Sequence, residues 1–433
     1  MGVDLRQVVA GILTITMFVM LIHMIKRDHF DAVVQDKFPG ATKDADFENS
    51  KFEGTHVRKD IGLWKGDAAD KLKPCWAKPS GDDVEQTEGF VIFSLTNGPE
   101  YHMSQILRER SSIICNSAIA DAVIVARSLG ATLVIPDIRG SQPGDKRNFE
   151  EIYDVDVFKK SMGGVVRVVK DLPDNISKNK IAAMKVPNRV TEDYIVTHVE
   201  PIYRSKGNIR LATYFPSVNM RKAGKNGDTD SIACLAMYGS LELQPEIKDL
   251  VDSMVERLRT LSRKSDGQFI AVDLRVEMLD KKGCQGSEDG EKEKRCYNAE
   301  EIAKFLRKIG FEKDTTIYVT ESRWDDSLDS LKDLFPKTYT KEAIIPADKK
   351  TKLEDSKDSE LEKVIDFYIS SESDVFVPAI SGLLYANVAG RRIGNGKTQI
   401  LVPADIQDSS ASVSNFLSPY ISKKNHFAYS CYC

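Results

Sequence analysis

The sequence has little with which to build a metal site. Its seven cysteines include no CxxC pair, and its six histidines are scattered along 433 residues. Structural zinc sites take cysteine and histidine ligands at short, regular spacings. The sequence therefore argues against a zinc-binding protein.

The chain also lacks an excess of positive charge. Its formal net charge is −4, from 61 lysines and arginines against 65 aspartates and glutamates. Proteins that bind nucleic acid usually need a concentrated basic face. The composition gives no reason to expect a nucleic-acid partner.

Three motifs of common enzyme classes are missing. The sequence contains no P-loop of the form GxxxxGK[ST], no GxGxxG fingerprint and no GxSxG elbow. These motifs mark P-loop NTPases, dinucleotide-binding enzymes and α/β-hydrolases. Their absence removes support for all three classes.

A long apolar run is present at the N-terminus. Residues 8–25, VVAGILTITMFVMLIHMI, carry no charge apart from a possible one on His23. Eighteen helical residues span about 27 Å, close to the hydrocarbon thickness of a bilayer. The run ends in bulky residues and Lys26-Arg27, unlike a cleaved signal peptide, so we expect an uncleaved anchor. The flanking charges are nearly balanced and do not set its orientation.

Some cysteines are placed for disulfides. Cys284 and Cys296 flank the charged loop QGSEDGEKEKR, and a bond between them would close this loop in an oxidising compartment. The sequence CYC at the C-terminus could tie the tail down in the same way. The alternative is that these thiols are free and buried. Asn175 begins the only N-x-S/T sequon and is a glycosylation candidate.

The chain is too long for one hydrophobic core, so two domains are expected. Residues 28–85 are polar and irregular, which is typical of a stem. After residue 90, β-branched runs alternate with helical patterns, an order that favours α/β domains with covered parallel sheets. The expected strands include 90–95, 132–138, 269–274, 315–320, 374–379 and 399–403. The expected helices include 121–130, 245–264, 298–310, 325–335, 360–371 and 383–390, with 245–264 as the divider.

Polar residues follow three predicted strands of the second half. In open parallel sheets, ligands bind beyond the carboxyl ends of the strands. Arg275, the segment 320–323 and the Ser381-Gly382 step meet this condition. An arginine can hold a diphosphate with two hydrogen bonds, and a small step that opens a helix offers free N–H groups. Together they suggest a nucleotide-diphosphate site. The alternatives are an ion pair of Arg275 with Glu277 or Asp280, and an ordinary helix cap.

Several longer segments resemble a known family. The segments FIAVDLRVEMLDKKGC, SDVFVPAISGLLYANVAGRR and LGATLVIPDI resemble motifs of plant O-fucosyltransferase-like proteins. MGVDLRQVVAGILTITMFVML, FSLTNGPEYHMSQI, CLAMYGSLELQPE, FPKTYTKEAI and LSPYISKKNHFAYSCYC resemble the mannan-synthesis-related branch of that family. The resemblance extends over nearly the whole chain.

The resemblance implies a GT-B glycosyltransferase, an α/β protein with two Rossmann-like domains that face a cleft. It implies a single-pass type II protein of the Golgi membrane with its body in the lumen. The expected parts are a cytoplasmic tail, the anchor, a stem, an N-terminal acceptor-side domain and a C-terminal nucleotide-sugar-side domain. Their ranges are 1–7, 8–25, 26–85, 86–245 and 246–433.

The resemblance also assigns site residues. It implies that Arg275 grips the donor diphosphate and that Asp374 contacts the nucleotide base. Ser381 and Gly382 match a phosphate contact at a helix start. Asn97 and Gly98 match the beginning of a loop that lines the cleft from the N-terminal domain, and Asp273 stands beside Arg275 in the matched motif.

The chain departs from the family pattern in three places. Asp273 stands where the wider family has histidine, and a carboxylate would repel a diphosphate unless it pairs with Arg275 or another cation. Ser381 replaces an aspartate, and PEYHMSQ replaces a Gly-x-Asn-Gln-x-Arg pattern after Gly98. The donor sugar therefore cannot be taken as fucose. Residues 107–119 interrupt the branch pattern, either as a splice or gene-model insertion or as a helix extension.

We expect a metal-independent, inverting transferase that uses a GDP-linked sugar in mannan or glucomannan synthesis. It would need no cofactor besides the donor, and its acceptor would be a polysaccharide or glycan. Glu100 follows the first strand and is the candidate base that takes the acceptor proton; the alternative is a solvated loop residue. A second hypothesis is a non-catalytic accessory protein that supports a cellulose-synthase-like mannan synthase.

Overall fold

The computed structural model describes residues 61–64, 72–78, 86–94, 115–135, 137–139, 146–176, 181–187, 189–214, 227–279, 296–350, 359–404 and 412–433. All of them belong to one compact unit, Arg58–Cys433. The predicted tail and anchor, residues 1–25, lie outside the described residues. No helix within those ranges is long and apolar enough to cross a membrane.

The first half of the unit contains a parallel sheet of five strands in the order β5-β2-β1-β7-β6. Its strands are β1 (Phe90–Ser94), β2 (Thr132–Val134), β5 (Val168–Val169), β6 (Ala182–Pro187) and β7 (Asn208–Tyr214). A separate antiparallel pair follows β2, formed by β3 (Asp137–Arg139) and β4 (Lys146–Asn148).

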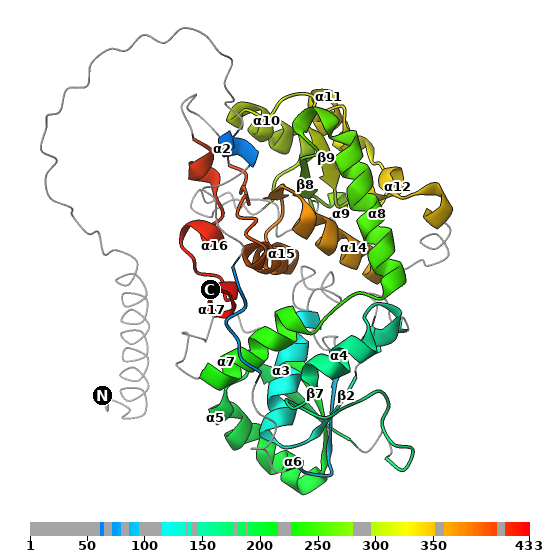
Figure 1. Ribbon diagram of the computed structural model, residues 1–433, viewed down its shortest axis with the longest axis vertical. Coiled ribbons are helices and arrows are strands. Elements are labelled where there is room, and N and C mark those ends of the chain that lie inside the picture. The colour runs from blue at the N-terminus through cyan, green and yellow to red at the C-terminus, as the bar shows by residue number, and fades with distance from the viewer. Residues whose placement is uncertain are drawn as a thin grey trace, which may run out of the picture. The chain divides into compact units, whose positions relative to one another are not determined.

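Helices accompany this sheet in the lower part of Figure 1. They are α3 (Cys115–Ser128), α4 (Val155–Met162), α5 (Glu192–Tyr194), α6 (Glu200–Lys206) and α7 (Gly227–Cys234). The helix predicted over 121–130 thus begins six residues earlier. The last five residues of the segment 107–119 belong to this helix.

The second half contains a parallel sheet of four strands in the order β10-β9-β8-β11. The strands are β8 (Phe269–Asp273), β9 (Thr316–Val319), β10 (Thr338–Tyr339) and β11 (Val375–Pro378). Every residue of β8, β9 and β11 is buried. The prediction of a mixed α/β protein with parallel sheets is confirmed.

Helices alternate with the strands of this half. One long helix, α8 (Pro245–Leu261), precedes the first strand. The others are α9 (Val276–Leu279), α10 (Ala299–Ile309), α11 (Asp329–Leu334), α12 (Lys341–Ile344), α14 (Ser359–Glu372), α15 (Leu383–Gly394), α16 (Pro419–Ser422) and α17 (Ala428–Cys431). Local sequence explains α10 well. Asn298 and Glu301 form a capping box, and Gly310 ends the helix with φ of 113°.

Alternate residues of the second sheet enter different cores. Ile270, Val272 and Ile317 pack in a core with α10 and α11. Phe269, Ala271 and Tyr318 pack with α8 and α14 instead, in a core that continues to the first sheet. This alternation is the period of two that a strand buried on both faces requires. It places Asp273 and Thr320 on the face covered by α8 and α14.

One predicted strand is wrong. Residues 399–403 form isolated bridges instead, Ile400 with Phe376 and Leu401 with Leu417. Both apolar residues are buried, but the backbone leaves the sheet after one bridge because Pro403 ends the run and cannot donate to a ladder. The strand predicted over 132–138 splits into β2 and β3. The proposed division into domains at residues 245 and 246 stays a prediction.

Candidate functional site

Three of the predicted positions gather at one edge of the second sheet. Strands β9, β8 and β11 are neighbours, with Val272 beside Val319 and Asp273 beside Pro378. Because the strands are parallel, the residues that follow them emerge at the same edge. Arg275, Thr320 and Ser381 are therefore brought to the carboxyl edge, as the sequence predicted.

Arg275 forms an ion pair with Asp273, two residues before it in the sequence. Its Nε lies 3.2 Å from Oδ1 of Asp273, and the two side chains are 16% and 1% exposed. Thr320 donates a second hydrogen bond to the same oxygen, at 3.3 Å. From the sequence, we expected the Asp273 carboxylate to repel a diphosphate unless a cation paired with it. The structure supplies that cation, because the carboxylate pairs with Arg275.

The other carboxylate oxygen of Asp273 has no such support. Oδ2 is buried and makes no hydrogen bond among the described residues. Burial raises the pKa of this carboxyl, against the opposing charge of Arg275 and the hydrogen bond from Thr320. A buried carboxyl of this kind can take up a proton more readily than an exposed one, which weakens its repulsion of a nearby anion.

The start of α15 is open. Ser381 and Gly382 are exposed, and a Cβ placed on Gly382 would meet no heavy atom within 4 Å. The helix that follows has 12 residues, and its first N–H groups have no partner within the helix. These donors and the Ser381 hydroxyl suit a phosphate group.

A buried polar cluster lies behind this edge, on the same face as Asp273. Lys341 donates to Asp366 at 2.5 Å, and their side chains are 1% and 7% exposed. Tyr318 donates to the same carboxylate, also at 2.5 Å. Burial raises the pKa of Asp366 to about 6, although Lys341 and Tyr318 oppose the rise.

Sequence reasoning missed this cluster. The signal was present in the helix predicted over 360–371, where Asp366 stands among Val364, Ile365 and Ile369 on an apolar face. A lone acid in such a stripe needs a buried cation, but nothing in the local pattern identifies Lys341 as that partner.

Asp374 is not brought to the carboxyl edge. It precedes β11, and its carboxylate accepts from the Phe269 backbone N–H at 3.0 Å and pairs with Arg259 at 3.3 Å. Phe269 is the first residue of β8, so Asp374 lies at the amino edge, about four residues or 13 Å from Asp273 along the sheet. The predicted base contact and Arg275 are therefore at opposite ends of these strands.

Several predicted residues lie outside the described ranges. They are Asn97, Gly98, Glu100 and Cys284. Cys296 is disulfide-bonded, and its partner is not among the described side chains, so the pairing with Cys284 stays a prediction. Asn175 is exposed, as a glycosylation site must be. Among the residues that the structure describes, no group of three His, Cys, Asp or Glu side chains could hold a metal ion.

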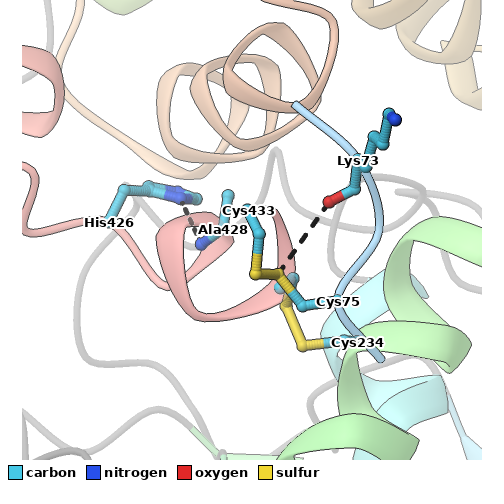
Figure 2. The surroundings of a disulfide bond; sticks show 7 residues. Lys73, Cys75, Cys234, His426, Ala428 and Cys433 are labelled. Atoms are coloured by element: carbon cyan, nitrogen blue, oxygen red, sulfur yellow. Dashed lines mark hydrogen bonds between the residues drawn. A yellow bond between two sulfur atoms is a disulfide. The ribbon is translucent and has the colours of Figure 1, made fainter. Parts of the chain in front are cut away.

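Two disulfides fasten the C-terminal tail, as Figure 2 shows. Cys433 is bonded to Cys75, and Cys431 to Cys234 at the end of α7. Backbone hydrogen bonds join Lys73 to Cys433 in both directions, at 2.9 and 2.8 Å. The prediction that the CYC sequence ties the tail down is confirmed, and the alternative of free thiols is wrong for these four cysteines.

The chain is similar to several known proteins. A family profile described as "GDP-fucose protein O-fucosyltransferase" matches residues 115–394. The chain is 60% identical over 444 aligned residues to "Protein MANNAN SYNTHESIS-RELATED 1" of Arabidopsis thaliana, and 46% identical over 434 to "Protein MANNAN SYNTHESIS-RELATED" of Trigonella foenum-graecum. Each alignment covers 100% of both chains. A crystal structure of POFUT1 in complex with GDP matches 73% of this chain and 99% of its own, with 13% identity and a TM-score of 0.43.

Proposed function

This chain belongs to the O-fucosyltransferase family, and from that premise we propose that it transfers sugar from a GDP-linked donor in mannan or glucomannan synthesis. The full-length relatives named for mannan synthesis support the pathway. The observation that carries the proposal is the pairing of Asp273 with Arg275 at the carboxyl edge of the second sheet, beside the open start of α15. We propose the GT-B arrangement for its two sheets, with residues 86–245 on the acceptor side.

Each residue of the site has a distinct role in this proposal. Arg275 presents its planar guanidinium to the diphosphate, and the Ser381 hydroxyl and the N–H groups at the start of α15 hold a phosphate oxygen. Asp273 positions Arg275 through its Nε, which leaves the direction of the guanidinium fixed. No metal ion is needed, because the arginine and the helix start offset the charge of the departing diphosphate.

Inversion at the sugar carbon requires a base on the opposite side of the cleft. We propose Glu100, which follows β1 in the sequence but lies outside the described residues. It would accept the proton of the acceptor hydroxyl while the bond between sugar and diphosphate breaks. The acceptor is a polysaccharide or glycan of the mannan type.

The disulfides support a lumenal body. Bonds such as Cys75–Cys433 and Cys234–Cys431 form and persist in oxidising compartments and are rare in the cytosol. Together with the apolar run at residues 8–25, they support a type II protein of the Golgi membrane. Residues 1–7 would then face the cytoplasm.

One observation favours a second function. Asp273 places a buried carboxyl where the wider family has histidine, directly beside the proposed diphosphate contact. If its charge prevents turnover, the body would serve as an accessory protein that binds a cellulose-synthase-like mannan synthase. The two functions differ in whether the protein alone transfers sugar.

A transfer assay separates them. The full-length chain, purified in detergent, is incubated with radiolabelled GDP-mannose or GDP-fucose and a mannan oligosaccharide, and label in the oligosaccharide is counted. Arg275→Lys should lose at least about tenfold in rate, since lysine cannot make the two-pronged contact, and Glu100→Gln should lose transfer altogether. Arg263→Lys, an exposed arginine near the amino edge, is the matched control. No transfer by the parent from either donor would favour the accessory function.

A further inference from the structure

A pocket lies away from the carboxyl edge. Its volume is about 180 Å³, and it lies between the π-helical turn Leu235–Gly239, the helices α14 and α15, and the C-terminal tail. Five aromatic rings line it: Tyr153, Tyr238, Phe367, Tyr368 and Tyr432. Such a concentration of tyrosines in one small pocket gives flat apolar faces and hydroxyl groups together.

Two glycines of α15 bring tyrosines onto its backbone. A Cβ on Gly390 would come within 2.6 Å of the Tyr238 hydroxyl, and one on Gly394 within 2.4 Å of the Tyr432 ring. These glycines are one helical turn apart, so they open one face of the helix. The two rings, whose centroids lie 5.4 Å apart, are therefore set in place by close packing, and this part of the pocket lining has a defined shape.

Arg391 places its guanidinium group in the lining of this pocket. Its guanidinium lies 4.5 Å from the centre of the Tyr368 ring, and its Nε is buried without a hydrogen bond among the described residues. Asn395, at the end of α15, is a further polar residue of the lining.

The charges around the pocket have both signs. The Tyr368 hydroxyl is subject to the positive charge of Arg391 and the negative charge of Glu242. A ligand with a net charge would be attracted by one and repelled by the other. The tyrosine hydroxyls, Asn395 and Arg391 of the lining suit a neutral ligand that carries several hydroxyl groups.

The size of the pocket limits the ligand further. At about 30 Å³ for each water of the liquid, 180 Å³ holds about six waters, which is the scale of one six-membered sugar ring. A sugar ring offers an apolar C–H face to an aromatic ring and hydroxyls to amide and guanidinium donors. Arg391 follows Gly382 by nine residues, about 13 Å along the helix, so the pocket is separate from the proposed phosphate contact.

We propose that this pocket binds one neutral hexose unit of a glycan chain and so holds an acceptor at a distance from the donor site. The choice of mannan as the glycan rests on the proposed function. The existence of a sugar-binding pocket rests on the aromatic lining and on the hydroxyl, amide and guanidinium groups beside it.

The test is a titration of the full-length chain with β-1,4-mannotetraose, in a detergent without a sugar headgroup. Trp76 reports binding, because its ring lies 5.2 Å from that of Tyr432 in an edge contact. Leu241→Trp fills the pocket from its half-buried rim and should weaken binding at least about tenfold. Leu334→Trp makes the same change at an exposed leucine of α11 and should leave binding as in the parent.

A second pocket variant distinguishes loss of binding from loss of folding. Arg391→Gln keeps a long polar side chain but removes the guanidinium, and it should also weaken binding while the melting temperature stays near that of the parent. Mannotetraose affinity unchanged in both pocket variants, or tighter binding of the anionic tetragalacturonate, would overturn the proposal. Binding is measured without nucleotide. If mannotetraose binds in the pocket but GDP does not bind to the protein, the donor site alone is refuted. If GDP binds but mannotetraose does not bind in the pocket, the pocket proposal alone is refuted.

Discussion

Replacing Lys341 by methionine should make the stability of the protein depend on pH in a defined way. Methionine fills nearly the same space, so little cavity is left, but Asp366 loses the cation that lies 2.5 Å away in a site where both side chains are almost fully buried. A carboxyl group in such a place avoids burying its charge by binding a proton. The native variant should therefore keep Asp366 protonated at neutral pH.

The magnitude follows from the pKa of this group. In the parent, burial raises the pKa of Asp366 from 3.8 to about 6, so the native carboxyl is largely ionised above pH 6, as it is in the unfolded chain. In Lys341→Met the native state binds one more proton than the unfolded state, so stability falls as pH rises, by about 1.4 kcal/mol per pH unit. Two pH units above 6, at pH 8, the variant should be about 2.7 kcal/mol less stable than the parent from this effect.

The assay is unfolding in urea at several pH values from 5 to 8, followed by tryptophan fluorescence. The difference between parent and variant should be small at pH 5, where both native states hold the proton, and should grow with pH. The double variant Lys341→Met with Asp366→Asn should lose the dependence. An equal loss of stability at pH 5 and pH 8 would refute the reasoning, since it would show that packing and not charge determines the cost.

Two further predictions concern the tail. Cys75→Ser and Cys433→Ser should each lower stability by about 2–4 kcal/mol, and the double variant should lose no more than either single one, because all three remove the same bond; additive losses in thermal melts would argue against the Cys75–Cys433 pairing. His426 accepts from the Ala428 N–H through Nδ1, and burial lowers its pKa from 6.5 to about 4. The contribution of neutral His426 to the free energy of unfolding is therefore present above pH 6.5 and is lost as pH falls toward 4, by at most about 3 kcal/mol. His426→Asn should flatten the dependence of the melting temperature on pH in this range, and an unchanged dependence would count against this prediction.

Local patterns were enough to predict three of the four strands of the second sheet, β8, β9 and β11. Strands β8, β9 and β11 are short runs buried on both faces, and helices alternate with them along the chain. The helix α10 also has clear start and stop residues, Asn298 and Gly310. Signals of this kind lie within a few residues of one another, so a single sequence reveals them. The positions of Arg275 and Ser381 at strand ends follow directly.

Contacts between distant residues could not be predicted in this way. The tail disulfides join cysteines 358 and 197 residues apart, and six or seven cysteines permit many pairings. Asp366 meets a lysine 25 residues away. The position of Asp374 is a local matter instead, because a residue that precedes a strand lies at the edge opposite to one that follows a neighbouring parallel strand. The failed strand at 399–403 shows that a buried apolar run need not pair along its length.

The central claim is that Arg275 binds the donor diphosphate, and a calorimetric titration with GDP tests it most directly. To avoid leaving Asp273 buried without its partner, the comparison uses Asp273→Asn as the reference and adds Arg275→Gln to it. A hydrogen bond to a charged group contributes about 1.5–3 kcal/mol, so GDP should bind roughly ten- to a hundredfold more weakly in the double variant. Equal GDP affinity in the two proteins, with equal melting temperatures, would contradict the account.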